Sequence, residues 1–213
     1  MRAMTFVTDG LAVTTRGMLQ EGLPEIRVQV DTSSLLPECE RFLRFVTDYL
    51  LKAGSRIKSG ETMNFGYWLV KFQGVGKDLL DVWEYNSEGT DFVIGGSLAL
   101  RYWRDQHDVC SEHQAEFTPP RPDKLTVVSA GVLQGLPTQG VRYPWQEHMS
   151  GWLLVTEKWD QDIKSLTHHH TYHVTSARPD LARFLALPVG FRFDVTKGER
   201  VWWDDEVARQ QPL

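Results

Sequence analysis

The alternation of apolar and polar residues changes period early in the chain. In residues 25–30, Ile26, Val28 and Val30 alternate with polar residues, which predicts a half-buried strand. Between residues 33 and 54, apolar residues recur every three or four positions, and Gly54 closes the run, which predicts a helix. The buried stripe expected for this helix is Cys39, Phe42, Leu43, Val46, Tyr49 and Leu50.

The next stretch is rich in short aromatic and β-branched runs. Residues 64–72, 79–85 and 91–96 are such runs, separated by Gly, Asn or Ser, and they predict an antiparallel meander. Gly74 and Gly76 are expected to form a hairpin turn between two of these strands. Residues 97–108 then predict a second helix with Ser97 as its N-cap.

The second half of the chain also consists of short strand-like runs with few helices. Strands are expected at 124–133, 151–157, 190–195 and 200–206, with a short helix at 176–188 capped by Ser176 and ending before Pro188. These runs of strands with few helices predict an α+β fold of antiparallel sheets with helices packed on them. The proline-dense segment 117–124 is expected to be a linker or loop between an N-terminal region, 1–116, and a C-terminal domain, 125–213.

Composition and charge narrow the function classes. The 213 residues carry a formal net charge of -5, which argues against a nucleic-acid binder and fits an acidic protein that meets a basic partner. The two cysteines are far apart and form no C-x-x-C motif, so no disulfide framework or thiolate zinc site is expected. No apolar stretch has the length of a signal-peptide core or a membrane span, which predicts a cytoplasmic protein without membrane contact.

The histidine run in "KSLTHHHTYHV" (164–174) raises the question of a metal site. On a strand, His168 and His170 would share a face, whereas His173 would lie on the other side unless the strand bends. Zinc needs three or four convergent ligands, and the chain has no H-E-x-x-H motif and no cysteine near the run. This pattern favours a solvated histidine-rich strand, with a metal site made from the histidines and a nearby aspartate as the alternative.

Other catalytic motifs are missing, whereas tryptophan is abundant. The run "IGGSLAL" lacks the last glycine of G-x-S-x-G, so Ser97 is not expected to be a nucleophile. No other run carries a catalytic fingerprint, and we expect no catalytic residues, no cofactor and no enzymatic activity. Among eight tryptophans, Trp202 and Trp203 are consecutive, and on a strand one of them would point outward. An outward tryptophan beside acidic residues would suit an interface anchor, and the alternative, expected for most of the eight, is a place in the core or on a sheet face.

The last third of the chain resembles a known family. It begins with "GWLLVTEKWDQD" (151–162), continues with "HTYHVTSARPDLARFLALPVGFRFDV" (170–195) and ends with "ERVWWDDE" (199–206). This order is similar to that of a bacterial immunity-protein domain found beside polymorphic toxins. The positions that match its pattern are Gly151, Trp152, His170, His173, Leu185, Leu187, Pro188, Gly190, Arg192, Phe193, Val201, Trp202 and Asp204. The resemblance implies core positions for Leu185, Leu187 and Phe193, and we expect Arg192 to pair with Asp204.

The resemblance implies an immunity protein that neutralises a toxin by covering its active site. Such toxins are delivered between bacteria by contact-dependent or type VI secretion, and the acidic balance favours a basic nuclease. The partner-binding residues expected from the sequence are Trp159, Asp160, Asp162, Trp203, Asp204, Asp205 and Glu206. The N-terminal region could supply the interface instead, through Glu84, Glu88 or Asp91. The alternatives are a metal-dependent hydrolase built on His168, His170 and His173, and a scaffold protein without a single partner.

Overall fold

The strand patterns of the first half of the chain come together in one mixed sheet. The computed structural model describes residues 4–210. Contacts divide the chain into two compact units, Met1–Arg104 and Asp105–Leu213, and the division falls within a helix. The first unit contains β1 (Thr5–Asp9), β2 (Ala12–Arg16), β3 (Glu25–Gln29), α1 (Leu36–Ala53), β4 (Thr62–Phe65), β5 (Trp68–Gly74), β6 (Leu79–Tyr85), β7 (Phe92–Ile94) and the start of α2 (Ser97–Glu112), with short 3-10 turns η1 (Met18–Glu21) and η2 (Ser33–Leu35).

The first sheet has the strand order β1-β2-β3-β6-β5-β4, and β7 also pairs with β6. Strands β4 to β7 form the predicted antiparallel meander, in which Gly76, with φ +74°, forms part of the turn between β5 and β6. The run 64–72 is two strands rather than one, because the chain turns at Gly66, where φ is +56°. The pairing of β3 with β6 is parallel.

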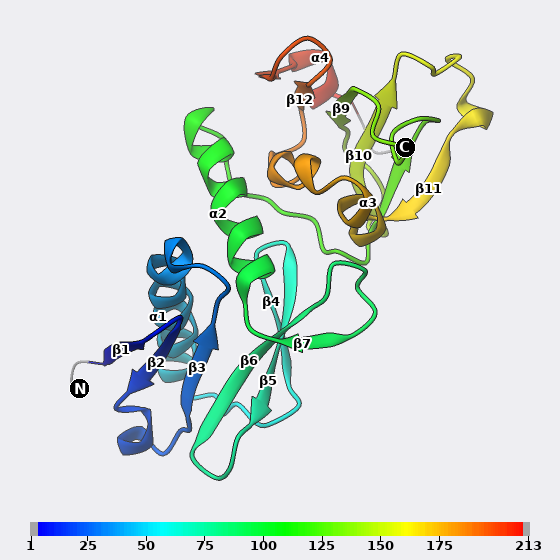
Figure 1. Cartoon of the computed structure of the whole chain (residues 1–213). Coiled ribbons are helices and arrows are strands. Elements are labelled where there is room, and N and C mark those ends of the chain that lie inside the picture. The colour runs from blue at the N-terminus through cyan, green and yellow to red at the C-terminus, as the bar shows by residue number, and fades with distance from the viewer. Residues whose placement is uncertain (1–3, 211–213) are drawn as a thin grey trace. The chain divides into compact units, whose positions relative to one another are not determined.

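Helix α1 packs against β2 and β3 with the predicted apolar stripe (Figure 1). Cys39, Phe42, Leu43, Val46 and Leu50 are buried, as expected. Tyr49 was expected in this stripe, but it is 54% exposed. Successive residues of a helix are about 100° apart, so Tyr49 lies at the edge of the stripe while Leu50, the next residue, lies at its centre and is buried.

Helix α2 begins as predicted at Ser97, but this residue does not cap it. The carboxylate of the buried Glu84 accepts hydrogen bonds from the backbone N–H groups of Leu98 (3.0 Å) and Ala99 (2.6 Å). The Ser97 hydroxyl instead accepts a hydrogen bond from the backbone N–H of Asp31. A carboxylate from a distant strand therefore does what the local sequence assigned to a serine.

The second unit is built on a second mixed sheet with the strand order β11-β8-β10-β9-β12-β13. The pairing of β8 with β10 is parallel and the others are antiparallel. Its elements are the end of α2, β8 (Leu125–Val128), β9 (Thr138–Arg142), β10 (Met149–Thr156), η3 (Ile163–Ser165), β11 (Thr167–His170), α3 (Thr171–Ala177), η4 (Pro179–Phe184), β12 (Phe191–Asp194), β13 (Arg200–Trp203) and α4 (Asp205–Ala208).

The core of this unit lies over the middle of the sheet. Leu185, Leu187 and Phe193 are fully buried, as the resemblance implied, and Trp152 is buried beside them. A Cβ atom at residue 140 would lie 2.1 Å from a carbon of the Phe193 ring, so only glycine fits at that position of β9. Close packing of this kind fixes the register of β9 against β12.

The predicted helix at 176–188 is wrong in its start and in its type. The α-helix α3 begins at Thr171, inside the histidine run, and Ser176 lies in its last turn. A 3-10 helix, η4, then begins at Pro179 and ends at Phe184. Proline cannot donate the backbone hydrogen bond that would continue α3, which explains the break.

The α+β class predicted from the sequence is confirmed, since each unit combines one sheet with a few helices. The segment 117–124 is without helix or strand and lies within the second unit. The domain limits 1–116 and 125–213 stay a prediction. No helix in residues 4–210 is long and apolar enough to cross a membrane.

Candidate functional site

The predicted partner-binding residues form two groups at opposite ends of the second sheet. Trp159, Asp160 and Asp162 follow Thr156, which pairs with Thr138 at the start of β9. Trp203 pairs with Phe191 at the start of β12, beside Arg142 at the end of β9. Thr138 and Arg142 are four positions apart along β9, which corresponds to about 13 Å at the usual rise of a strand.

The first group belongs to a loop that is held by its own polar atoms. A carboxylate oxygen of Asp160 accepts hydrogen bonds from the backbone N–H of Asp162 (3.0 Å) and the hydroxyl of Ser165 (2.7 Å). The bond from Ser165 holds the pKa of Asp160 below its usual value. Asp162 in turn caps η3 by accepting from the backbone N–H of Lys164. Both aspartates are exposed and have no ion-pair partner among residues 4–210.

The second group surrounds the end of β13. Asp204 caps α4 through the backbone N–H groups of Glu206 and Val207, and it forms the predicted ion pair with Arg192, at 3.2 Å. Asp205 accepts a hydrogen bond from the indole N–H of Trp203 (3.1 Å) and lies 3.7 Å from Arg209. Two of the three acids are therefore neutralised within the unit, and Glu206 retains the uncompensated charge.

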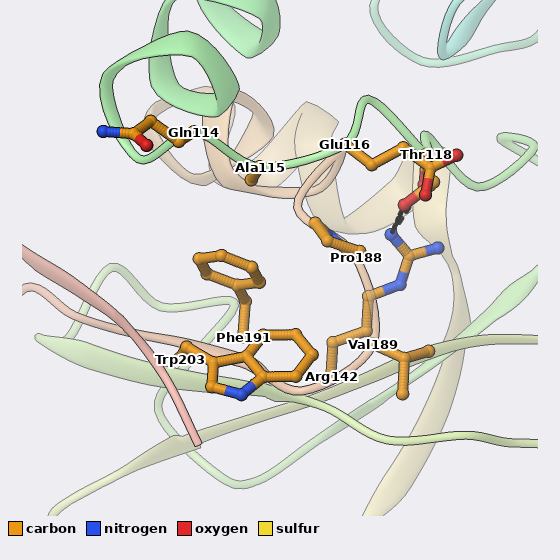
Figure 2. Close-up of a pocket in the computed structure, with 9 residues that line it drawn as sticks. All are labelled: Gln114, Ala115, Glu116, Thr118, Arg142, Pro188, Val189, Phe191 and Trp203. Atoms are coloured by element: carbon orange, nitrogen blue, oxygen red, sulfur yellow. Dashed lines mark hydrogen bonds between the residues drawn. The ribbon is translucent and has the colours of Figure 1, made fainter. Parts of the chain in front are cut away.

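Trp203 forms one wall of an open pocket with a volume of about 720 Å³ (Figure 2). The pocket is lined by the segment that follows α2, by the turn before β12 and by the ends of β9 and β13. Its lining residues are Gln114, Ala115, Glu116, Thr118, Arg142, Pro188, Val189, Phe191 and Trp203. All nine belong to the second unit, and Trp203 is the one among them that the sequence singled out as an anchor.

Trp203 and its neighbour Trp202 differ in surroundings. The Trp203 ring packs edge-on against Phe191, with ring centroids 5.3 Å apart, yet remains 48% exposed. Trp202 points to the other face of the strand, where the Arg200 guanidinium lies 5.7 Å from its ring centroid, and it does not line the pocket. The alternation of a strand thus gives two exposed tryptophans in different environments.

Arg142 is the buried charged residue of the pocket. Its Nη1 donates hydrogen bonds to the carbonyl oxygens of Thr118, Leu185 and Leu187 and to the Thr118 hydroxyl. In residues 4–210, no carboxylate forms an ion pair with it, and its buried Nε has no acceptor. Burial lowers the pKa of this guanidinium to about 10, because a buried charge loses its hydration.

The structure does not bring the histidines of the run together with further metal-ligand side chains in residues 4–210. Among residues 4–210, no group of three or more His, Cys, Asp or Glu side chains could hold a metal ion. The chain leaves β11 after His170 and enters α3, so His173 lies on a helix, with its ring 6.0 Å from that of His170. The Nδ1–H of His170 donates to the carbonyl oxygen of Asp123 (2.8 Å), and burial and the nearby histidines lower the pKa of His173.

The N-terminal candidates are only partly available. Glu84 is buried and caps α2, so it cannot contact a partner, whereas Glu88 and Asp91 are exposed. Sequence reasoning did not single out Arg142, Glu116 or Thr118 as site residues. The available signal for Arg142 was a single arginine in the sequence "GVRYP" (140–144). Such a residue by itself does not show whether its side chain is buried or exposed.

Comparison with known proteins gives one family-model match, which lies within the second unit. The searches of curated proteins and of solved structures gave no match. The family model of the Imm33-like domain matches residues 105–205, which include every residue of the pocket. The matched segment covers the second sheet from β8 to β13. This match supports an immunity-protein family for the Asp105–Leu213 unit.

Proposed function

We propose that this chain is a cytoplasmic immunity protein that binds a cognate bacterial toxin and neutralises it by covering its active site. The single observation that carries the proposal is the Imm33-like match over the unit that holds the exposed Trp203 and its pocket. An exposed tryptophan beside a pocket is the kind of residue that dominates binding energy at protein interfaces. Binding to a toxin, rather than catalysis, is the activity that follows from this family.

The toxin is proposed to be a basic nuclease, delivered by type VI or contact-dependent secretion. Residues 105–213 contain 15 Asp and Glu against 11 Lys and Arg, so this unit carries most of the net negative charge. Asp160, Asp162 and Glu206 have no ion-pair partner among the described residues, and they present this charge to solvent. A nuclease holds phosphates with Lys and Arg, so an acidic inhibitor is attracted to its substrate site.

The experiment is co-expression of this protein with the product of the gene adjacent to its own, followed by native mass spectrometry. We expect a complex of defined stoichiometry, and loss of toxin activity in it. Trp203→Ala is expected to weaken binding by about 2 kcal/mol, and Trp202→Ala is the matched control, since it removes an equally large exposed ring outside the pocket. If the co-expressed protein folds but forms no complex with this chain, the proposal is overturned.

The nuclease part of the proposal has its own test. If charge attraction drives association with a basic toxin, the association rate should fall steeply as salt is raised. Lysine substitutions at Asp160, Asp162 and Glu206 should reduce this salt dependence, while a neutral toxin would show none. If a complex forms and its association rate does not depend on salt, the immunity function stands, and the proposal that the toxin is a basic nuclease is ruled out. The metal-dependent hydrolase is not favoured, since no metal-binding cluster lies in residues 4–210.

A further inference from the structure

Two arginines are buried in the second unit, and they differ in one respect. Arg178 donates from Nη1 to the carbonyl oxygens of Val132 and Leu136 and to the Thr138 hydroxyl. Its Nε and Nη2 bind the two carboxylate oxygens of Asp180, at 2.9 and 2.7 Å. Arg142 has the first half of this arrangement, because its Nη1 also binds backbone carbonyls and a threonine hydroxyl. Among residues 4–210, nothing takes the place of Asp180.

A buried guanidinium without a carboxylate is an unusual arrangement. Burying an unpaired charge costs free energy, which an anion brought to it would recover. Arg142 is 8% exposed and lines the pocket, and its Nη2 makes none of the four hydrogen bonds that hold the side chain. The pocket therefore offers a fixed positive charge that is already positioned by the backbone around it. Such a preorganised donor binds an anion without first having to be ordered.

From this arrangement we propose that the pocket beside Trp203 binds a carboxylate attached to an apolar group. The Trp203 and Phe191 rings and Pro188 supply the apolar wall (Figure 2). Glu116 also lines the pocket and disfavours a doubly charged anion such as phosphate more than a singly charged carboxylate. In the toxin complex the occupant is an Asp or Glu side chain of the toxin. This last step rests on the proposed function, whereas the binding of a carboxylate does not.

The test uses the whole protein and three probes. N-acetylphenylalanine carries the carboxylate and an aromatic ring, its amide differs only in lacking the charge, and inorganic phosphate is the competing class of anion. Binding is followed by two-dimensional ¹H–¹⁵N NMR, with the Trp203 indole and the Gln114–Thr118 amides as reporters. We expect a Kd on the order of 1 mM for the acid, as for a good fragment of this size. The amide should bind at least about tenfold more weakly, because a charge-assisted hydrogen bond is lost.

Variants distinguish this pocket from other sites. Trp203→Ala should weaken the acid severalfold, and Trp202→Ala should leave its Kd unchanged. Arg142 is left intact, because it also ties Thr118 to Leu185 and Leu187 and its removal is expected to destabilise the unit. Equal binding of acid and amide, shifts that map away from the pocket, or phosphate binding more tightly than the acid would overturn the proposal.

The outcome is separable from that of the toxin experiment. If the acid binds at Trp203 and no toxin complex forms, the carboxylate site stands and the immunity function fails. If the toxin binds and Trp203→Ala has no effect on it, while the acid still binds in the pocket, the toxin uses another surface. In that case the carboxylate site stands, and the proposal that a toxin Asp or Glu side chain occupies it is ruled out.

Discussion

At the scale of single residues, the two long helices end in the same way with different residues. Helix α1 ends at Ala53 and is followed by Gly54, with φ +58°, and the backbone N–H of Ser55 donates to the carbonyl oxygen of Leu50. Two residues after the end of α2 at Glu112, Gln114 has φ +51°, and the backbone N–H of Ala115 donates to the carbonyl oxygen of Cys110. Both are Schellman endings, which favour glycine at the left-handed position. Gln114 is therefore a strained residue at the rim of the pocket.

Gln114→Gly should raise the free energy of unfolding by about 0.5–1 kcal/mol, because glycine adopts the left-handed conformation without the Cβ penalty. The matched control is Gly54→Gln, which places the same side chain at the end of α1. Its Cβ would meet no atom within 4 Å, so the expected loss of about the same size reflects backbone strain alone. Urea unfolding measures both, and a destabilised Gln114→Gly protein would contradict the assignment.

The carboxylate of Glu84 on β6 caps the start of α2, and removing it tests this role. Glu84→Ala leaves the N–H groups of Leu98 and Ala99 without their acceptors and should cost about 1–3 kcal/mol. Ser97→Ala, at the residue that the local sequence indicated as the cap, should cost less than about 1 kcal/mol, since its hydroxyl accepts from the Asp31 N–H and not from an N–H group of the helix. If thermal unfolding gives the reverse order, Glu84 is not the cap.

At the scale of elements, β9 was not expected from the sequence, yet it is central to the second sheet. Its sequence, Thr138–Arg142, contains a glycine and alternates poorly, so neither period nor propensity indicated a strand. The reason lies in packing, because Gly140 makes room for the Phe193 ring of β12. Strands that were expected, such as β3 and β10, bury apolar residues on one or both faces. Their hydrophobic pattern is therefore visible in the local sequence.

Gly140→Ala should destabilise the second unit by at least about 1–3 kcal/mol, because the new Cβ would overlap the Phe193 ring. The double variant Gly140→Ala with Phe193→Leu should be less destabilised than the sum of the two single variants, since the smaller side chain makes room. A double-mutant cycle on unfolding free energies measures this coupling. Additive losses would mean that the strand shifts instead of the ring.

At the scale of the whole molecule, titratable groups of the two units respond to acid in opposite directions. Burial raises the pKa of Glu84 in the first unit, so its titration contributes stability at low pH that is lost as pH rises through the raised pKa. In the second unit, the hydrogen bond from Arg178 lowers the pKa of Asp180. The pKa of Asp194 is also lowered, because Thr196 and Arg200 outweigh the effect of burial.

The lowered pKa values predict that the second unit loses stability first on acidification. The contribution of Asp180 and Asp194 is fully present above the ordinary aspartate pKa of about 4 and is lost as pH falls below it. Hydrogen exchange or NMR, resolved by unit, should show second-unit amides opening at a higher pH than first-unit amides. Asp194→Asn should reduce this difference, and an unchanged pH profile in that variant would contradict the role of Asp194.

Much of the fold and one part of the site could be predicted from the sequence alone. Local hydrophobic patterns predicted the strand in 25–30 and the helix in 33–54. The family resemblance predicted the burial of Leu185, Leu187 and Phe193, and the sequence also suggested the pairing of Arg192 with Asp204. These features depend on residues a few positions apart or on a shared motif, and such information is present in the order of the amino acids.

The tertiary structure decided what depends on residues far apart in the chain. It separated Trp159, Asp160 and Asp162 from Trp203, because β9 and β12 place them at opposite ends of one sheet. It gave the capping of α2 to Glu84, and it buried Arg142 among carbonyls from two other segments. Whether a charge is compensated depends on which distant groups surround it. Composition and spacing contain no such distances, so the pocket beside Trp203 became visible only in the folded chain.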